Sequence, residues 1–430
     1  MKTIYPCRTL RGGVQPPGDK SIAHRYAMLG AIADGETRLY NYPSGRDVHS
    51  TLRCMHRLGT DIEIHGSEIL IRGRGLFGLQ ASSQTLDVGN SGTTIRLLSG
   101  ILAGQPFRTR VNGDESIQRR PMKRIMAPLR QMGAQIQARE DAFPPLEIQG
   151  GKLKAIDYPL PTPSAQVKSC VLLAGLYAQG NTHITESVAT RNHTELALEH
   201  FGAALDVESS GITLHPGAPL TGVTMNIPGD ISSAMFWILG ALIRPESEVE
   251  IRHVGLNPSR NAVLHRLACW GAEIHIQPSS PTGMEVTGTL TVRHSPGIGK
   301  GARLEVKSED VPLMIDEIPA LAVLGACTPG GMSIHGAEEL RVKESDRLRA
   351  IAENLQRMGI PVQERNDGLD IEGGRPLHGA EIQTFGDHRI AMAFSLAALA
   401  ADSPSTLDDP ESAAVSYPDF YEHLQSLAVP

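Results

Sequence analysis

One pattern recurs along the chain: a predicted helix ends in an apolar residue, a glycine follows, and a strand begins. It places Gly59, Gly133, Gly202, Gly271 and Gly359 at successive intervals of 74, 69, 69 and 88 residues. A glycine just past a helix adopts the left-handed conformation that closes the helix. Self-similarity at a nearly constant spacing indicates one supersecondary unit used several times. The chain is therefore expected to be built from repeated units.

A second pattern alternates with the first, a polar turn followed by a helix of small apolar residues. The turns lie at residues 18–21, 89–92, 164–166, 229–232, 316–319 and 386–389. Helices that are apolar nearly all round are buried. Together the two patterns predict six units of about 70 residues, each with two helices and several short strands. The last helix of the first kind is expected over residues 417–427.

The six units divide into two sets of three. The Pro-Gly-Asp turn at residues 17–19 returns at residues 228–230, 211 residues later. Two similar domains are expected, one over 15–227 and the other over 1–14 and 228–430. The first strand (2–10) is expected in the second domain, and extra hairpins at 279–301. If the polar helix starts point the same way in each domain, they line a cleft between the domains that favours anions.

Composition narrows the class of protein. A chain of 430 residues with 40% hydrophobic and 20% charged residues is typical of a soluble globular protein of two domains. The net charge of −7 argues against nucleic-acid or anionic-membrane binding. Five cysteines without a C-x-x-C pair fit a reducing compartment and no zinc site, and no apolar run is long enough to span a bilayer. We expect a cytoplasmic monomer that binds no metal.

Residues 13–21 come close to a nucleotide-binding P-loop. The match fails because Asp19 separates the second glycine from the lysine. Pro16 and Pro17 also remove two N–H donors that such a loop needs for phosphates. What remains is a candidate anion-binding trio on one helix start: Lys20, Ser21 and Arg25.

Four other polar stretches each allow a plain and a functional interpretation. The turn at 90–93 can bind phosphate or simply cap a helix, and the paired arginines at 119–120 can bind an anion or lie exposed. Asp316 precedes an apolar helix, where it can be the N-cap or a general base. The charged start at 343–347 can be a solvated helix face, or an anion site with a carboxylate that carries protons.

In their order along the chain these stretches resemble the 5-enolpyruvylshikimate-3-phosphate (EPSP) synthase family. The resemblance covers essentially the whole chain. Its most specific motifs are Arg-Val-Lys-Glu-Ser-Asp-Arg at 341–347 and Gly-Asp-His-Arg-Ile-Ala-Met at 386–392. It implies an α/β fold of two similar inside-out, barrel-like domains, each made of three β-α-β-α-β-β repeats.

The resemblance also implies a reaction. Members of the family transfer the enolpyruvyl group of phosphoenolpyruvate to the 5-hydroxyl of shikimate 3-phosphate and release phosphate, through a tetrahedral ketal intermediate. This is a step toward the aromatic amino acids, and it needs no metal or organic cofactor. A rival is UDP-N-acetylglucosamine enolpyruvyltransferase, which has Lys-Asn at the position of Lys20-Ser21 and usually a reactive cysteine in a mobile loop. Residues 112–121 contain no cysteine. A non-catalytic anion-binding homologue is a second alternative.

Motif by motif, the resemblance implies roles for individual residues. Asp316 would be the base on the 5-hydroxyl and Glu344 the acid and base at the methyl carbon. The full catalytic set is Asp316, Glu344, Lys343, His388 and Lys20. The set for shikimate 3-phosphate is Lys20, Ser21, Arg25, Ser164, Ala165, Gln166, Arg191, Asp316 and Lys343. The set for phosphoenolpyruvate is Lys20, Gly92, Arg120, Gln166, Arg347 and Arg389.

The chain departs from the family pattern at two positions. Val415 stands where many members have a lysine, which removes one cation from the phosphoenolpyruvate site unless another residue supplies it. Ala165 gives Ser-Ala-Gln where some members have Ser-Ser-Gln. Gly92 keeps the small residue that leaves room for the inhibitor glyphosate, so we expect glyphosate binding to persist.

Overall fold

The structure is a computed structural model that describes residues 1–429 of the chain. It divides into two compact units. Unit 1 comprises residues 1–17, 228–281 and the described residues from 286 onward, and unit 2 comprises residues 18–227 and 282–285. Residues 15–17 thus group with unit 1, and the short segment 282–285 groups with unit 2.

Glycine closes the helices where the repeat predicts it. Gly59, Gly133, Gly202, Gly271 and Gly359 all have positive φ, between 86° and 110°. The helices that precede them are α2 (Arg46–Arg57), α5 (Lys123–Met132), α7 (His193–His200), α9 (Ala262–Cys269) and α12 (Arg347–Arg357). The last helix of this kind, α14, covers Phe420–Leu427 and starts slightly later than predicted.

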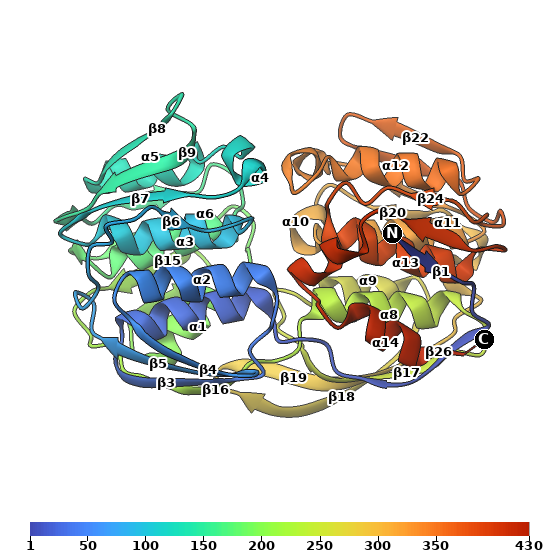
Figure 1. The fold of residues 1–430 in the computed structure, drawn as a ribbon, viewed down its shortest axis with the longest axis horizontal. Coiled ribbons are helices and arrows are strands. Elements are labelled where there is room, and N and C mark those ends of the chain that lie inside the picture. The colour runs from blue at the N-terminus through green and yellow to red at the C-terminus, as the bar shows by residue number, and fades with distance from the viewer. Residues whose placement is uncertain (430) are drawn as a thin grey trace. The chain divides into compact units, whose positions relative to one another are not determined.

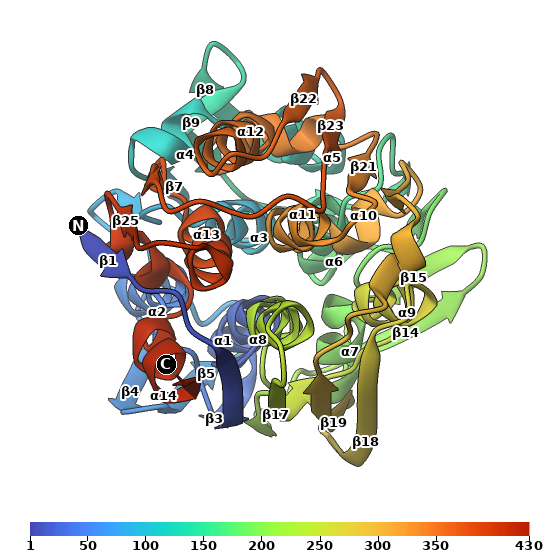
Figure 2. The ribbon, with the colours of Figure 1, turned by 90° about the vertical axis from the view of Figure 1, so that its right-hand side faces the viewer.

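The buried helices of the second pattern are also present. Unit 2 contains α1 (Lys20–Ile32), α3 (Gly92–Ala103) and α6 (Ala165–Gly175), and unit 1 contains α8 (Ile231–Ile243), α11 (Ile318–Cys327) and α13 (His388–Ala400). Nearly all their residues are buried. Figure 2 looks along α8, α11 and α13, which lie together with strands on their outer side. Helices inside and sheets outside make the inside-out arrangement that was predicted.

Unit 2 repeats one sheet pattern (Figure 1). In each four-stranded sheet the first pair of strands is parallel and the following pairs are antiparallel. The first sheet contains β16 (Thr224–Asn226), β3 (Asp34–Tyr40), β5 (Glu68–Arg74) and β4 (Asp61–His65). The second contains β6 (Leu86–Asp87), β7 (Arg108–Asn112), β9 (Phe143–Gln149) and β8 (Gln135–Arg139). The third contains β11 (Asp157–Pro159), β13 (Thr182–Thr185), β15 (Gly211–His215) and β14 (Ala204–Glu208), and β10 (Leu153–Lys154) pairs with β12 (Ala178–Gln179).

Unit 1 repeats the pattern once without change and twice with variations. The unchanged sheet contains β20 (Leu304–Val306), β21 (Met332–Ile334), β23 (Gly368–Ile371) and β22 (Val362–Arg365). The larger sheet contains β18 (Glu273–Thr282), β19 (Glu285–Arg293), β17 (Glu248–Gly255), β2 (Thr9–Val14) and β26 (Ala428–Val429). The smallest contains β1 (Lys2–Ile4), β25 (Ser405–Leu407) and β24 (Glu381–Ile382).

Three predictions need correction. The single strand expected over 2–10 is two strands, β1 and β2, which join different sheets of unit 1. The hairpin expected within 279–301 is β18 and β19, and it begins at residue 273. The term barrel-like is also inaccurate, because the sheets of the described chain are separate and none closes on itself.

The hydrophobic core follows the same division. One buried cluster lies wholly in unit 1 and a second lies wholly in unit 2. Each is built mainly from the apolar helices and the inward-facing residues of the surrounding strands. Within residues 1–429, no helix is both long and apolar enough to cross a membrane.

Candidate functional site

In unit 2 the N-terminal ends of the buried helices meet. Arg96 on α3 donates from Nη1 to Oε1 of Gln166 on α6, at 2.7 Å. The amide nitrogen of the same Gln166 donates to Oγ1 of Thr93, at 3.1 Å. Gln166 thereby connects two helix starts whose backbone N–H groups attract anions. The structure brings together residues that lie 70 and 73 positions apart in the sequence.

Lys20 begins α1, and a carboxylate holds it in place. Its Nζ lies 2.8 Å from Oδ2 of Asp47, in the first turn of α2. The Lys20 side chain keeps 20% of its surface exposed. Asp47 was not among the predicted residues, because no local pattern pairs it with Lys20. The lysine is therefore oriented and still accessible.

Arg25 lies one turn further along α1 and is only 3% exposed. Its guanidinium donates to Oγ1 of Thr194 at 2.6 Å, to Oγ of Ser169 at 2.8 Å and to the carbonyl of Ser21 at 2.8 Å. Burial lowers the pKa of Arg25 to about 10, and the nearby carboxylate of Glu195 opposes that shift. These three acceptors are neutral oxygens, so none of them is a carboxylate that would balance the charge of Arg25.

Gly92 begins α3 between two arginines. A β-carbon on this residue would lie 2.9 Å from Nη1 of Arg96 and 3.0 Å from Nη1 of Arg120. Arg120 is 7% exposed, whereas the side chain of Arg119 is 79% exposed. The surface interpretation therefore holds for Arg119 and is wrong for Arg120. Arg96, which the sequence did not single out, adds a second guanidinium beside Gly92.

The capping interpretation is correct for the turn at 90–93, and the turn before α6 is capped in the same way. Ser91 accepts a hydrogen bond from the Thr94 amide at the start of α3. Ser164 accepts one from the Val167 amide at the start of α6, where Ala165 is the first helical residue. Capping the helix does not prevent either turn from lying beside a ligand.

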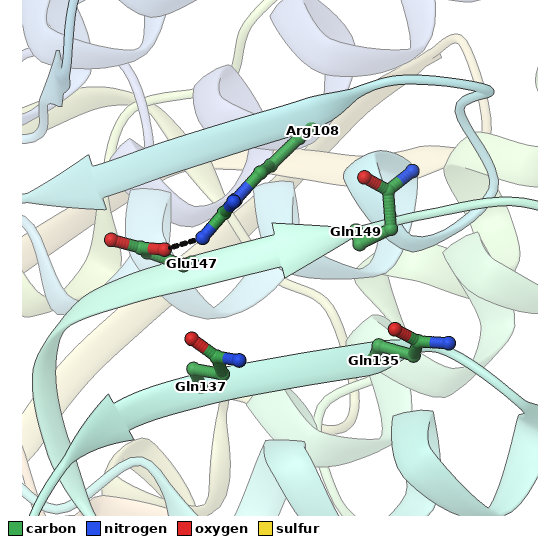
Figure 3. A pocket seen from close by; sticks show the side chains of 5 residues that line it. All are labelled: Arg108, Gln135, Gln137, Glu147 and Gln149. Atoms are coloured by element: carbon green, nitrogen blue, oxygen red, sulfur yellow. Dashed lines mark hydrogen bonds and ion pairs between the residues drawn. The ribbon is translucent and has the colours of Figure 1, made fainter.

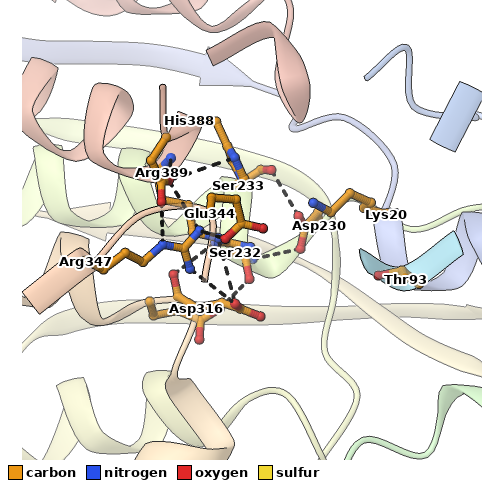
Figure 4. A network of polar contacts seen from close by, with 12 residues as sticks. Lys20, Thr93, Asp230, Ser232, Ser233, Asp316, Glu344, Arg347, His388 and Arg389 are labelled. Carbon is orange, nitrogen blue, oxygen red and sulfur yellow. Dashed lines mark hydrogen bonds and ion pairs between the residues drawn. The ribbon is translucent and has the colours of Figure 1, made fainter. Parts of the chain in front are cut away.

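Arg347 is the centre of a charged network in unit 1 (Figure 4). It begins α12 and is 1% exposed. Its Nε donates to Oδ2 of Asp387 at 2.8 Å, and its Nη2 donates to Oε2 of Glu344 at 2.6 Å. Its Nη1 makes no hydrogen bond within residues 1–429. The solvated-face interpretation of this helix start is therefore wrong.

The charges of this network shift in the expected directions. Burial opposes the charge on Arg347, but the carboxylates of Asp387 and Glu344 outweigh it and raise the pKa of the guanidinium. Burial also opposes the charge on Asp387, yet Arg347 lowers the pKa of that carboxyl below its ordinary value. Burial lowers the pKa of Lys343, and the carboxylates of Asp316 and Glu344 act in the other direction.

Asp316 lies among three arginines. Its carboxylate oxygens are 3.9 Å from nitrogens of Arg260, Arg347 and Arg389. Arg389 also donates from Nη1 to the Asp316 carbonyl, at 3.0 Å. Asp316 is not the N-cap of the following helix, because α11 begins at Ile318 and Glu317 occupies the cap position. Its carboxylate is held by charge at the start of the helix.

His388 is the first residue of α13 and is buried. Its Nδ1 lies 4.0 Å from Oδ1 of Asp387, whose side chain caps the helix through the Arg389 amide. Asp387 thus contacts both Arg347 and the α13 start. Asp316, Glu344 and His388, three of the predicted catalytic residues, therefore belong to one connected group of side chains.

Arg260 is a member of this group that sequence reasoning missed. It is 4% exposed, donates from Nη2 to Oγ of Ser232 at 2.6 Å, and lies 3.4 Å from Oε1 of Glu317. Ser232 in turn donates to Glu317. The only signal in the sequence is an arginine in a short polar turn between β17 and α9, which is too common to point to a site.

Val415 ends the 3-10 helix η3 (Pro410–Val415) and contributes no charge. Two residues later, the hydroxyl of Tyr417 accepts a hydrogen bond from Nε1 of Trp237 at 3.0 Å in a buried aromatic cluster. The departure from the family pattern at this position is therefore accompanied by a well-packed local structure.

A hollow on the surface lies apart from these residues (Figure 3). It has a volume of about 140 Å³ and is lined by residues of β7, β8 and β9 in unit 2. Arg108, its one cation, is paired with Glu147. None of the predicted residues lines it. We therefore do not count it as a candidate site.

The fold and these two groups of side chains define a class of protein. Each unit gathers charged residues at the joined starts of buried helices, with arginines and lysines in unit 2 and arginines with carboxylates in unit 1. Fixed cations beside carboxylates suit an α/β enzyme that moves protons on anionic small molecules.

The chain belongs to the EPSP synthase family. The family model for EPSP synthase (3-phosphoshikimate 1-carboxyvinyltransferase) matches residues 4–424.

Individual relatives agree over their full length. The chain is 52% identical to a 3-phosphoshikimate 1-carboxyvinyltransferase of Solibacter usitatus, with 99% of both chains covered. It is 49% identical to one of a Synechococcus species, with 100% of this chain and 97% of the relative covered. A solved structure of EPSP synthase from Acinetobacter baumannii superposes with a TM-score of 0.88 at 42% identity, over 99% of this chain and 98% of that one.

Proposed function

We propose that this chain transfers the enolpyruvyl group of phosphoenolpyruvate to the 5-hydroxyl of shikimate 3-phosphate and releases phosphate. The observation that carries the proposal is the position of Asp316 in unit 1. A carboxylate within 3.9 Å of three buried arginines, next to Lys343 and Glu344, combines proton carriers with fixed positive charge. Transfer between two anionic substrates needs both.

The proposed reaction has two halves. In the first, Asp316 takes the proton of the 5-hydroxyl while the oxygen attacks C2 of phosphoenolpyruvate and C3 receives a proton from Glu344. A tetrahedral ketal phosphate results. In the second, Glu344 removes a proton from the new methyl group, the carbon–carbon double bond re-forms, and phosphate leaves. Lys343 stabilises charge at the 5-oxygen, and His388 and Lys20 assist the proton transfers.

The binding roles follow from charge and position. We propose that Arg25 and Arg191, with Ser21, Ser164, Ala165 and Gln166, bind shikimate 3-phosphate, and that the first two hold its phosphate. The phosphate of phosphoenolpyruvate binds Lys20, Arg120, Gln166 and the Gly92 turn. Arg347 and Arg389 bind its carboxylate. Support for this role comes from Nη1 of Arg347, which makes no hydrogen bond within the described chain.

The domain assignment belongs to the proposal as well. Residues 15–227 form one enolpyruvyl-transferase domain and residues 1–14 with 228–430 form the other. Since the proposed reaction uses residues of both, the two domains act on one pair of substrates. The same proposal describes a monomeric, cytoplasmic protein that binds no nucleic acid. Gel filtration with light scattering tests the oligomeric state.

Phosphate release from phosphoenolpyruvate tests the function directly. Release by the wild-type protein should require shikimate 3-phosphate. It should fall by about 10²–10⁴-fold in Asp316→Ala, which lacks the general base. Release with UDP-N-acetylglucosamine in place of shikimate 3-phosphate would assign the chain to the rival reaction. No release with either acceptor would identify a non-catalytic anion-binding homologue.

A further inference from the structure

A buried lysine in unit 2 has no part in the proposed reaction. Lys168 lies in α6, two residues after Gln166, and its side chain is 1% exposed. The rest of this helix is mostly small and apolar. A lysine is rarely buried without paired carboxylates. Gln166 is a predicted substrate-binding residue, so the contacts of Lys168 bear on the geometry of the substrate site.

Lys168 holds both ends of one segment. Its Nζ lies 2.8 Å from Oε2 of Glu186, which follows β13, and 2.6 Å from Oε1 of Glu195 in α7. The same Nζ donates to the carbonyl of Thr190 at 3.4 Å, and the Thr190 hydroxyl donates to Oε1 of Glu186 at 2.5 Å. Three residues of the segment 186–195 thus contact the ammonium group of Lys168. Arg191, the next residue after Thr190, belongs to this segment.

The opposite side of the segment is anchored too. His193, at the start of α7, has its Nδ1 2.7 Å from Oε1 of Glu285. Both side chains are 2% exposed. Residues on each side of Arg191 are therefore held by buried polar contacts, and the backbone that carries its guanidinium has little freedom to move.

The segment also determines the position of Arg25. Thr194, the neighbour of Glu195, accepts the hydrogen bond from Nε of Arg25 at 2.6 Å. Its hydroxyl also lies 2.6 Å from Oγ of Ser169, the residue after Lys168, and that Oγ is a second acceptor for Arg25. The two side-chain acceptors of Arg25 are thus next in sequence to members of the Lys168 group.

The charges of the group favour two neighbouring arginines. Glu186, Glu195 and Lys168 together carry one net negative charge behind Arg25 and Arg191. The electrostatic effect of Arg191 disfavours the charged form of Arg25, and that of Glu195 favours it. A buried net negative charge therefore offsets part of the repulsion between the two guanidinium groups before a phosphate binds.

We propose that Lys168 is the positioning residue of the phosphate subsite. By joining Glu186, Thr190 and Glu195, it holds Arg191 and Arg25 in the geometry that binds the 3-phosphate, without contacting the substrate. The inference rests on the proposed function, because it assigns that phosphate to these arginines. Preorganised arginines avoid the ordering cost that a flexible loop would add to binding.

The test uses Glu186→Gln, which keeps the side-chain shape and leaves Lys168 paired with Glu195. We expect the Kd and KM for shikimate 3-phosphate to rise on the order of tenfold, the effect of one charge-assisted hydrogen bond. The KM for phosphoenolpyruvate and kcat should stay near the wild-type values. The preference for shikimate 3-phosphate over unphosphorylated shikimate should fall by the same factor, because only the phosphate uses the two arginines.

Two further variants separate positioning from a purely structural role. Lys168→Met should show the same loss of phosphate preference to a larger degree. Glu199→Gln removes a carboxylate from an exposed position of the same helix, α7, and should match the wild type. If Glu186→Gln folds and keeps its phosphate preference, the inference is wrong, whether or not its melting temperature falls.

The outcome also differs from a failure of the proposed function. Wild-type protein that releases no phosphate with shikimate 3-phosphate would overturn the function. Calorimetry of the binding of shikimate 3-phosphate and of shikimate would still test the inference, because a binding measurement needs no turnover. Equal affinities for the two ligands in the wild type would overturn the phosphate subsite itself.

Discussion

Arg25 in unit 2 and Arg347 in unit 1 are both buried arginines within the first two turns of a helix, but their partners differ. Arg25 donates to two hydroxyls and a carbonyl, all neutral. Arg347 donates to the carboxylates of Asp387 and Glu344. The first arrangement positions a cation and leaves its charge for a ligand. The second uses most of the charge to hold carboxylates.

The pKa shifts follow this difference. Burial lowers the pKa of Arg25 to about 10, whereas the carboxylates around Arg347 overcome the effect of burial and raise its pKa. A site for a dianionic phosphate benefits from cations that are not already paired with carboxylates. A site for proton transfer benefits from carboxylates whose positions are fixed. The two units therefore use the same residue type in two ways: Arg25 leaves its charge to a ligand, whereas Arg347 fixes two carboxylates in place and keeps only its Nη1 for a ligand.

The largest effect is expected where unit 1 combines pairing with proton transfer. Glu344→Gln keeps an acceptor for Arg347 but removes the proposed proton carrier. Turnover should fall by about 10²–10⁴-fold, while the affinity for shikimate 3-phosphate stays unchanged because its phosphate subsite lies in unit 2. Steady-state phosphate release and calorimetry measure the two quantities. A loss of affinity equal to the loss of turnover would contradict the division of roles.

Removing each arginine tests the comparison itself. Arg347→Met leaves Asp387 and Glu344 without their cation, so the free energy of unfolding of unit 1 should fall by about 3–5 kcal/mol. Arg25→Met leaves neutral hydroxyls that still contact each other, and should cost only about 1 kcal/mol. Arg25→Met should instead raise the Kd for shikimate 3-phosphate by roughly 10–100-fold.

Tryptophan fluorescence in denaturant can follow unit 1 alone, because the two tryptophans of the sequence, Trp237 and Trp270, both lie in it. Circular dichroism follows the helices of both units, so the unfolding of unit 2 changes this signal and leaves the tryptophan fluorescence unchanged. Arg349→Met, at an exposed arginine of the same helix α12, is the control and should be nearly neutral. Equal destabilisation by Arg347→Met and Arg25→Met would remove the distinction between the two units.

A smaller effect is expected at Gly92. The β-carbon of Gly92→Ala would press on the ends of two flexible side chains, Arg96 and Arg120, which must shift by a few tenths of an ångström. We expect the KM for phosphoenolpyruvate and the inhibition constant for glyphosate both to rise, on the order of tenfold, with the affinity for shikimate 3-phosphate retained. Gly151→Ala, where a β-carbon meets nothing within 4 Å, is the matched control.

The smallest effect concerns pH. Burial lowers the pKa of Lys343 below its ordinary value of 10.5, so its charged form is lost as pH rises through the lowered value. The alkaline decline of kcat should therefore begin below pH 10.5. In Lys343→Arg the cation persists, and the decline should move to higher pH even if turnover is reduced. Lys307→Arg, at an exposed lysine, should leave the profile unchanged, and an unchanged profile in both would exclude Lys343 as the titrating group.

Most of the fold could be predicted because its signals are local. A glycine after a helix and a capped apolar helix each depend on a few neighbouring residues, and the positions of Gly59 and Gly359 were correct for that reason. Strand pairing was less accessible. The division of residues 2–10 between two sheets depends on strands near residues 250 and 406, which no local pattern identifies.

The candidate residues came from motifs, and their partners did not. Arg347 was predicted, but its pairing with Asp387, 40 positions away, required the structure. Arg260 and Asp47 were missed for the same reason. Lys168 did leave a signal, a single lysine in a helix otherwise suited to the core. A buried charge demands a counter-charge, but the sequence does not say which glutamates supply it.

The first strands of the chain pair with strands that are synthesised much later. β2 pairs with β17 and with β26, which contains residues 428 and 429. During synthesis, residues 18–227 leave the ribosome before the partner strands of β1 and β2. Unit 2 can therefore begin to fold while β1 and β2 are still unpaired. Unit 1 can complete its sheets only after residues 428 and 429 have left the ribosome. A nascent chain stalled near residue 400 should therefore expose its N-terminal segment to proteases, although most of unit 2 is already protected.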